Sequence, residues 1–167
     1  MRVWILTVVA GLTFLGTGLA DEKAKAADDK GKTEEKAKTD DKAKAAEKEA
    51  KMLEGTWQLI EGEMGGNKFP PAVAKGIKLT ISPGKYVVTA ESKDEGTVKY
   101  IPDTSPKAME VTGTAGPNKG KTFPAIYELK GDTLTVCYDL SGKARPTEFK
   151  SKPGTLLFLA KYTKIKP

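Results

Sequence analysis

The chemistry open to this chain is limited by the side chains that it lacks. Its 167 residues include no histidine and a single cysteine, Cys137. Without histidine, neither a Ser-His-Asp triad nor a Cys-His pair can activate a nucleophile, and a mixed His/Cys zinc site is excluded. One thiol forms neither an internal disulfide nor a Cys-x-x-Cys metal knuckle. Carboxylate, lysine, tyrosine and hydroxyl chemistry remain, but no spacing of acids demands a carboxylate dyad. We therefore expect no catalytic residue, metal or cofactor.

One segment has the spacing of a phosphate-binding loop. Ala115 is followed, after four residues, by Gly120, Lys121 and Thr122. That mechanism needs a helix after the loop, whose N-terminus faces the phosphates. Pro124 lies where such a helix would propagate, within a strand-like run. The sequence therefore predicts a Gly/Lys-rich loop between two strands.

The most distinctive polar cluster is Arg145-Pro146-Thr147-Glu148-Phe149. Arg145 can offer a planar fork to a carboxylate ligand at the mouth of the fold, with Glu148 beside it. We take both as candidate ligand-binding residues. The alternative is an internal ion pair of Arg145 with Glu148, Asp139 or Glu128 that pins a long loop.

Tyrosines supply the second set of candidates. The chain has five, spread over five expected strands. Those that face inward can line a cavity and offer hydroxyl groups to a ligand. Three are taken as candidate ligand-binding residues: Tyr100, Tyr127 and Tyr138.

These residues lie in a domain expected over 52–167, in which short alternating apolar runs are broken by Gly, Pro, Asp and Asn. One helical turn is expected at Pro71–Lys75. A tight hairpin is expected at Gly131-Asp132. Eight strands with short connections predict an all-β fold, an antiparallel up-and-down barrel, with a β-sandwich as the alternative. The expected strands are 53–64, 77–81, 86–91, 96–101, one around 109–111, 123–129, 133–139 and 156–162.

A signal peptide is expected over residues 1–20. Arg2 precedes an apolar run too short to span a bilayer, and Gly18 and Ala20 are the small residues that a signal peptidase reads. The alternative is an uncleaved N-terminal anchor. Export predicts a location in the periplasm, in the cell envelope or outside the cell.

A low-complexity linker is expected over residues 21–51, which contain only Asp, Glu, Lys, Ala, Gly and Thr. Such a segment buries too little apolar surface to offset the entropy of ordering it. We interpret it as a semi-rigid spacer, with helix favoured over 43–51. The alternative is contact with a charged envelope surface.

The start of the domain resembles lipocalin-type barrels, in which a glycine stands two residues before a first-strand tryptophan, here Gly55 and Trp57. More of the chain is similar to exported lipocalin-like domains of uncharacterised function, widespread in planctomycete bacteria. In lipocalin-type barrels a basic residue of the last strand lies over the tryptophan, so the resemblance implies a barrel-closing contact from Lys161. The alternative is a purely core Trp57 whose indole N–H is bonded to a carbonyl group. The matching motifs are Leu53-Glu54-Gly55-Thr56-Trp57, Gly116-Pro117-Asn118-Lys119-Gly120-Lys121-Thr122, Ile126-Tyr127-Glu128-Leu129, Gly131-Asp132-Thr133-Leu134 and Arg145-Pro146-Thr147-Glu148-Phe149.

The resemblance implies a fold and an envelope setting but no established activity. We expect an exported, non-catalytic binding module for a small apolar or amphipathic molecule inside the barrel. The alternative is an envelope interaction, scaffold or inhibitor-like protein with a filled barrel. The net charge of +6 comes mainly from scattered lysines, which argues against nucleic-acid binding. The expected partner is an unknown small molecule or an envelope protein, the expected state is a monomer, and membrane contact is expected only through an uncleaved signal segment.

Overall fold

The computed structural model describes residues 24–166, with side chains from residue 39 onward. The expected signal peptide at 1–20 and the first residues of the expected linker lie outside this range. One compact unit, Ala37–Pro167, contains the barrel together with the end of the preceding helix. Within residues 24–166, no helix combines the length and the apolar character needed to cross a bilayer.

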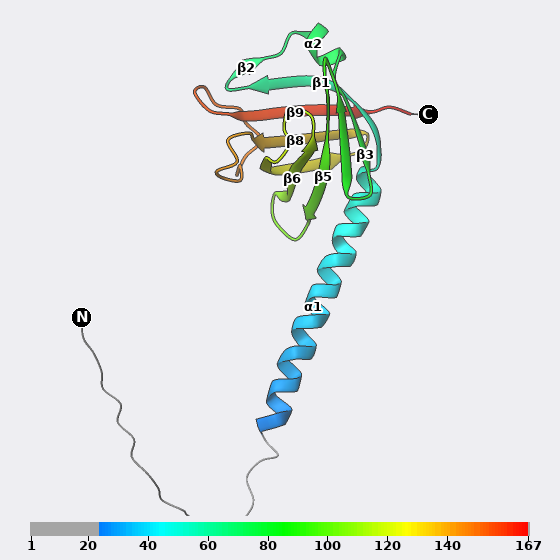
Figure 1. Ribbon diagram of the computed structural model, residues 1–167, viewed down its shortest axis with the longest axis vertical. Helices are drawn as coiled ribbons and strands as arrows, with labels where there is room; N and C mark the ends of the chain where they lie inside the picture. The colour runs from blue at the N-terminus through cyan, green and yellow to red at the C-terminus, as the bar shows by residue number, and fades with distance from the viewer. Residues whose placement is uncertain (1–23, 167) are drawn as a thin grey trace, which may run out of the picture. The chain divides into compact units, whose positions relative to one another are not determined.

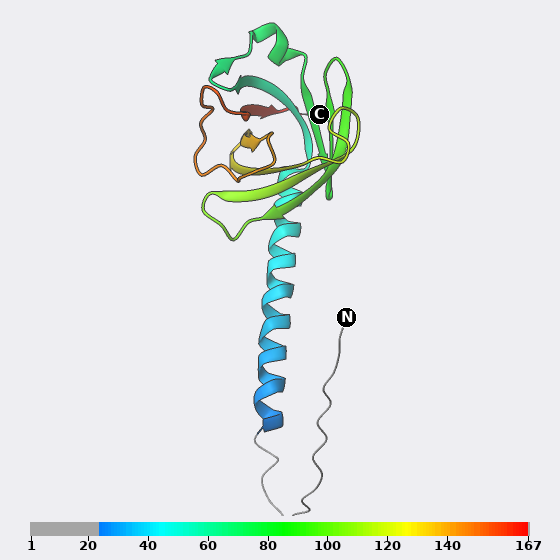
Figure 2. The same cartoon turned by 60° about the vertical axis from the view of Figure 1, so that its left-hand side comes forward.

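Eight antiparallel strands close into a barrel, as the sequence predicts (Figures 1 and 2). Strands β3 to β9 follow one another as a meander, and β1 pairs with both β3 and β9, which closes the sheet. This closure excludes the β-sandwich alternative. A two-residue strand, β2 (Asn67–Lys68), extends the sheet beside the end of β1. The barrel strands are β1 (Gly55–Met64), β3 (Lys78–Ser82), β4 (Lys85–Thr89), β5 (Lys93–Ile101), β6 (Lys107–Ala115), β7 (Thr122–Lys130), β8 (Thr133–Asp139) and β9 (Leu157–Lys164).

Helix α1 (Ala24–Leu53) is longer than the sequence predicts. It covers most of the expected linker and continues through Leu53, so that β1 begins at Gly55 and not at residue 53. Alanine, lysine and glutamate have high helix propensities, which favour helix along this segment. Packing adds to this, because Ala50 and Leu53 contact the barrel core. The short helix α2 (Pro71–Lys75) is the expected helical turn.

The last turns of α1 close one end of the barrel. Leu53 is buried and lines the barrel interior. Glu49, one turn earlier, is also buried and accepts a hydrogen bond from the hydroxyl group of Tyr127 at 3.1 Å. The same carboxylate forms an ion pair with Lys107 at the start of β6. Apolar contact and charge together therefore fix this part of the helix to the barrel.

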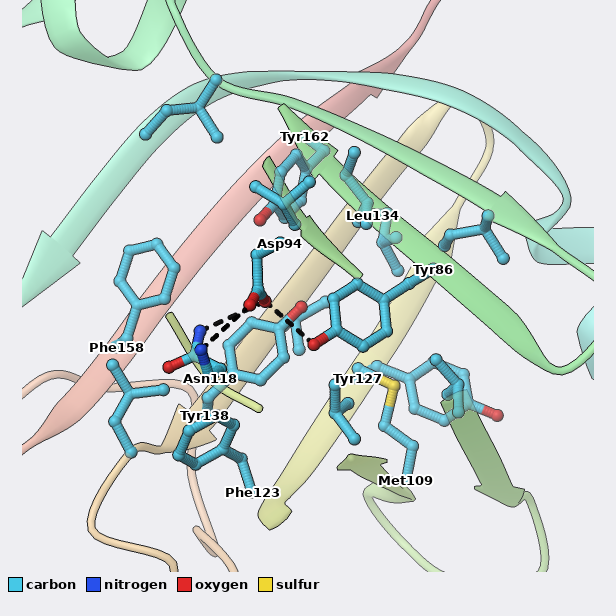
Figure 3. Close-up of a pocket in the computed structure, with 18 of the residues that line it drawn as sticks. Tyr86, Asp94, Met109, Asn118, Phe123, Tyr127, Leu134, Tyr138, Phe158 and Tyr162 are labelled. Atoms are coloured by element: carbon cyan, nitrogen blue, oxygen red, sulfur yellow. Dashed lines mark hydrogen bonds between the residues drawn. The ribbon is translucent and has the colours of Figure 1, made fainter. Parts of the chain in front are cut away.

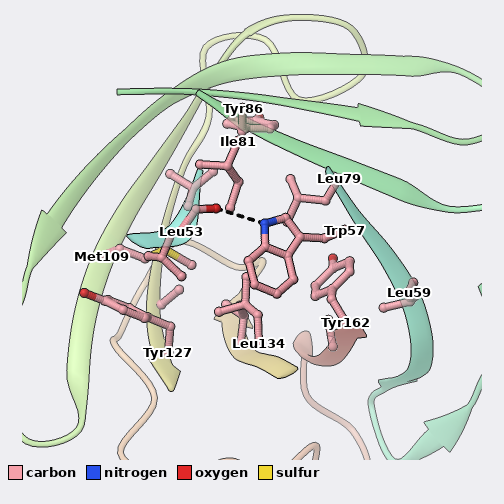
Figure 4. Close-up of a cluster of buried hydrophobic side chains, with 14 of the residues drawn as sticks. Leu53, Trp57, Leu59, Leu79, Ile81, Tyr86, Met109, Tyr127, Leu134 and Tyr162 are labelled. Atoms are coloured by element: carbon pink, nitrogen blue, oxygen red, sulfur yellow. Dashed lines mark hydrogen bonds between the residues drawn. The ribbon is translucent and has the colours of Figure 1, made fainter. Parts of the chain in front are cut away.

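Trp57 joins the helix to the barrel (Figure 4). Its indole N–H donates a hydrogen bond to the carbonyl oxygen of Leu53 at 2.9 Å. The carbonyl groups at a helix C-terminus have no partner within the helix, so this bond caps α1. Lys164 Nζ lies 3.5 Å from the carbonyl oxygen of Met52, where a cation also favours the helix dipole. The fully buried Trp57 thus packs in the core and binds a carbonyl group, as the core alternative expects.

The cation over Trp57 is Lys164, not Lys161. Lys164 Nζ lies 5.2 Å from the centroid of the ring. Trp57 and Lys164 are paired across β1 and β9, and paired residues share a face of the sheet. Lys161 lies three residues earlier, on the outward face, where its Nζ is 3.7 Å from Glu61. The resemblance identified the strand correctly, but the alternation of side chains along it selects a different lysine.

Gly55 provides the space for this contact. A Cβ atom at this position would lie 2.9 Å from Lys164 Cε, and the backbone φ of +132° is one that residues with a side chain rarely adopt. The glycine two residues before the tryptophan therefore admits the aliphatic part of the lysine. Gly55, Trp57 and Lys164 form one structural unit at the barrel closure.

We predict that Gly55→Ala lowers the free energy of unfolding by roughly 1–3 kcal/mol, because it adds both backbone strain and a steric clash. Gly84→Ala is the matched control. Its φ is also positive, +68°, but no atom lies within 4 Å of the added methyl group. Urea unfolding of both variants measures the difference. Equal losses of stability in the two variants would contradict the conclusion that Gly55 makes room for Lys164.

We also predict that Glu49→Gln destabilises the protein by about 1–3 kcal/mol, because it removes the charge that faces Lys107 and weakens the acceptor of Tyr127. Glu47→Gln removes the same charge from an exposed position on the same helix. Thermal unfolding should show a clear loss for the first variant and almost none for the second. A similar loss for both would mean that overall helix charge matters, and not this contact.

Candidate functional site

The barrel interior contains a cavity of about 270 Å³ that is partly open to solvent. It extends from Leu53 at the α1 end to Asn118 and Leu140, which lie in connections at the other end. Aliphatic and aromatic side chains make up most of its lining. Small-molecule sites usually measure roughly 300–1,000 Å³, so this cavity suits a small ligand. The interior is therefore hollow, which the sequence left open.

Aromatic rings occupy both ends of the cavity. Away from α1, Phe158 stacks between Phe69 and Tyr138, with ring centroids 5.5 Å and 5.8 Å apart. Near α1, Tyr100 and Tyr127 meet edge to face at 5.8 Å. Such ring pairs resist rearrangement and add stability beyond their buried area. They give the cavity defined walls.

A polar cluster of Asp94, Tyr86 and Asn118 interrupts the apolar lining (Figure 3). Asp94 Oδ2 accepts hydrogen bonds from the Tyr86 hydroxyl group at 2.9 Å and from Asn118 Nδ2 at 3.2 Å. Asp94 Oδ1 accepts one from the backbone N–H of Asn118 at 3.1 Å. All three donors are neutral. The side chain is buried, with the residue 8% exposed.

The segment that resembles a phosphate-binding loop supplies Asn118. It connects β6 to β7 and no helix follows it, as the sequence predicts. Gly116 lets this loop approach β5, because a Cβ atom there would lie 2.4 Å from the carbonyl oxygen of Lys93 and its φ is +84°. The loop is thereby folded against Asp94 and forms part of the cavity wall.

All five tyrosines line the cavity: Tyr86, Tyr100, Tyr127, Tyr138 and Tyr162. Burial is the main cause that raises the pKa of each above its ordinary value near 10. A hydrogen bond to Asp94 further raises the pKa of Tyr86, and the Glu49 carboxylate raises that of Tyr127. The hydroxyl groups are therefore protonated at neutral pH. Those of Tyr86 and Tyr127 donate to Asp94 and Glu49, and their oxygens can still accept a hydrogen bond.

The structure brings together some of the predicted site residues and separates others. Tyr100, Tyr127 and Tyr138 all line the cavity. Arg145 and Glu148 are not part of the lining. Glu148 forms ion pairs with Lys152 and Lys150. These two lysines, Lys152 more than Lys150, lower the pKa of Glu148 to about 2. The proposed pair of ligand contacts at the mouth is therefore not assembled.

Arg145 instead pins a long loop, through a partner that the sequence did not suggest. This cover loop, residues 140–156, connects β8 to β9. Arg145 Nη2 lies 3.4 Å from Glu110 Oε1 on β6. The expected alternatives are paired elsewhere: Glu128 with Lys130, and Asp139 with the N–H groups that follow it in the chain. The path of the loop across the barrel, which the sequence does not show, brings Arg145 to Glu110.

The cover loop lies against the outer face of the barrel. Ile126 and Cys137 face away from the cavity and are nevertheless buried, as is Pro146 of the loop. The Cys137 thiol donates a hydrogen bond to the Lys150 carbonyl oxygen at 3.6 Å. Burial raises the pKa of this thiol, which makes it unreactive.

Sequence reasoning missed the Asp94 cluster. The expected strands 86–91 and 96–101 leave Asp94 in a connection between them, but it lies within β5. The alternation of inward and outward side chains could have identified Asp94 as a cavity residue. Asp94, Val98 and Tyr100 share the inward face of this strand. A carboxylate at the start of an otherwise apolar face is the feature that marks the position.

The comparisons with known proteins identify no relative. No family model, no curated protein and no solved structure matches the chain. Over residues 24–166, no three His, Cys, Asp or Glu side chains are grouped so that they could hold a metal ion. The arrangement of the cavity is therefore the main source of information about function.

We predict that no tyrosine titrates near pH 10 in the folded protein. Because folding raises each tyrosine pKa, the native state binds more protons than the unfolded state above pH 10, and stability falls as pH rises through that region. Tyrosinate absorbance should appear at higher pH, together with unfolding measured by circular dichroism. Ionisation of several tyrosines at ordinary pKa values, without unfolding, would contradict their burial.

Proposed function

We propose that this protein is a non-catalytic binding module for a small, largely apolar molecule held inside the barrel. The observation that carries the proposal is the hollow, mainly apolar cavity of about 270 Å³. Such a lining favours an apolar body through the hydrophobic effect, while a few hydroxyl and carboxylate groups orient it.

The size of the cavity argues for the binding module over a filled-barrel scaffold. Apolar surface that stays in contact with water contributes no hydrophobic stabilisation, and apolar side chains make up most of this lining. Larger side chains at a few lining positions would recover that stabilisation. A hollow interior is thus best explained by an occupant.

We further propose that the chain belongs to the exported lipocalin-like family that its motifs resemble, and that it acts in the periplasm, in the envelope or outside the cell. The signal-like pattern of residues 1–20 supports export. The closure formed by Gly55 and Trp57 supports the family resemblance.

Straight-chain alcohols test the proposed function. We predict that affinity, measured by calorimetry, rises about fourfold for each added methylene until the cavity is full, since each buried methylene contributes about 0.8 kcal/mol. Val98→Trp should abolish this binding, because Val98 lines the cavity. Thr97→Trp places the same side chain on the exposed outer face and should bind normally. Absence of binding by the wild type, or equal binding by both variants, would refute a ligand in the barrel.

A further inference from the structure

We infer that the cavity takes an amphipathic amine, with an apolar body and a protonated amino group bound to Asp94. This inference rests on the proposed function and adds the chemical class of the ligand. It follows from the charge, the hydrogen-bonding capacity and the aromatic surroundings of the Asp94 cluster.

The first argument is charge. Among the described residues that line the cavity, Asp94 is the only one with a charged side chain. The nearby Lys93 lies on the outward face of β5, opposite to Asp94, where it pairs with Glu95 at 3.1 Å, so it does not neutralise Asp94. Burying a carboxylate without a cationic partner is unfavourable, and the three donors that bind Asp94 are all neutral. An ammonium group supplies that cation.

The second argument is the balance of donors and acceptors. An ionised carboxylate has about four positions that accept hydrogen bonds, and Asp94 uses three of them. The position left is on Oδ1. Tyr86 donates its only O–H to Asp94, so its oxygen can act only as an acceptor for a ligand. The side-chain carbonyl oxygen of Asn118 is a further acceptor. The cluster therefore presents mainly acceptors, and an ammonium group brings three donors.

The third argument is the surroundings of the carboxylate. Figure 3 shows Asp94 bonded to Tyr86 and Asn118, and the stacked rings of Tyr138 and Phe158 line the same cavity. Aromatic faces attract a cation within about 6 Å, more strongly where water is excluded. A carboxylate in a cavity lined by such rings favours a cation and repels an anion. The apolar remainder of the cavity accommodates the body of the ligand.

Asp94 also has a structural use, because it holds the β6–β7 loop through Asn118. That role alone predicts no preference among ligand head groups. An amine site predicts a strong preference for a cation over a neutral group of similar size, and rejection of an anion. The head-group preference of the wild-type protein therefore separates the two roles.

The experiment uses calorimetry with three ligands that share one body: 2-phenylethylamine, 2-phenylethanol and 3-phenylpropanoate. At neutral pH the amine should bind at least about tenfold more tightly than the alcohol, since hydrogen bonds to charged groups are the stronger ones. The carboxylate should bind most weakly. Equal affinities for amine and alcohol, or tighter binding of the carboxylate, would overturn the amine inference and leave the proposed function standing. If none of the three binds and the alcohol series also fails, the proposed function fails as well.

Two variants assign the preference to Asp94. Asp94→Asn should lose the preference and bind amine and alcohol with similar affinities. Glu95→Gln removes one negative charge from the neighbouring outward-facing residue and should keep the full preference. If Asp94→Asn keeps the preference, the inference is wrong. If that variant does not fold, the ligand series on the wild type and on Glu95→Gln decides, because neither depends on it.

Discussion

The contact that holds this structure together lies where Trp57 meets the end of helix α1. A sheet that closes on itself still has two ends, and each exposes apolar side chains unless something covers it. Here the indole N–H and Lys164 Nζ both bind carbonyl groups of the last helical turn. The same lysine lies over the indole ring, and Gly55 makes room for it. The same contacts therefore close the barrel and cap the helix. They also position Leu53, which forms one end of the cavity.

With one end covered, the interior can remain hollow without losing its shape. The rings of Phe158 and its neighbours support one another around the cavity. Asp94 binds two of its donors from the β6–β7 loop, so a loop rich in glycine and lysine becomes part of a rigid wall. Rigid walls matter for recognition, because a pre-formed cavity does not have to be ordered when a ligand enters. The polar cluster thus serves the wall and, in our proposal, the ligand.

Local pattern in the sequence was sufficient for the strands, because alternation and turn residues are properties of short segments. The hairpin at Gly131-Asp132 and the inward tyrosines are examples. The ion-pair partners of charged residues could not be predicted from such short segments. Lys164 and Glu110 were chosen by the register between strands that are distant in sequence, or by a loop folding back. The extent of α1 depends on the burial of Glu49 and Leu53. Asp94 lies on the alternating inward face of its strand, but the expected strands left it in a connection.

The cover loop over Cys137 has a consequence for oxidative chemistry. In an oxidising compartment an exposed lone thiol would be captured by small disulfides or would crosslink two chains. Beneath residues 140–156 this sulfur is out of reach, so the native protein resists both fates. The Cys137 thiol can react only in molecules whose cover loop has moved away. The rate of that reaction then follows the fraction of time for which the loop is open. The rate at which Cys137 reacts with a thiol reagent therefore reports how often the loop opens, and no label has to be introduced.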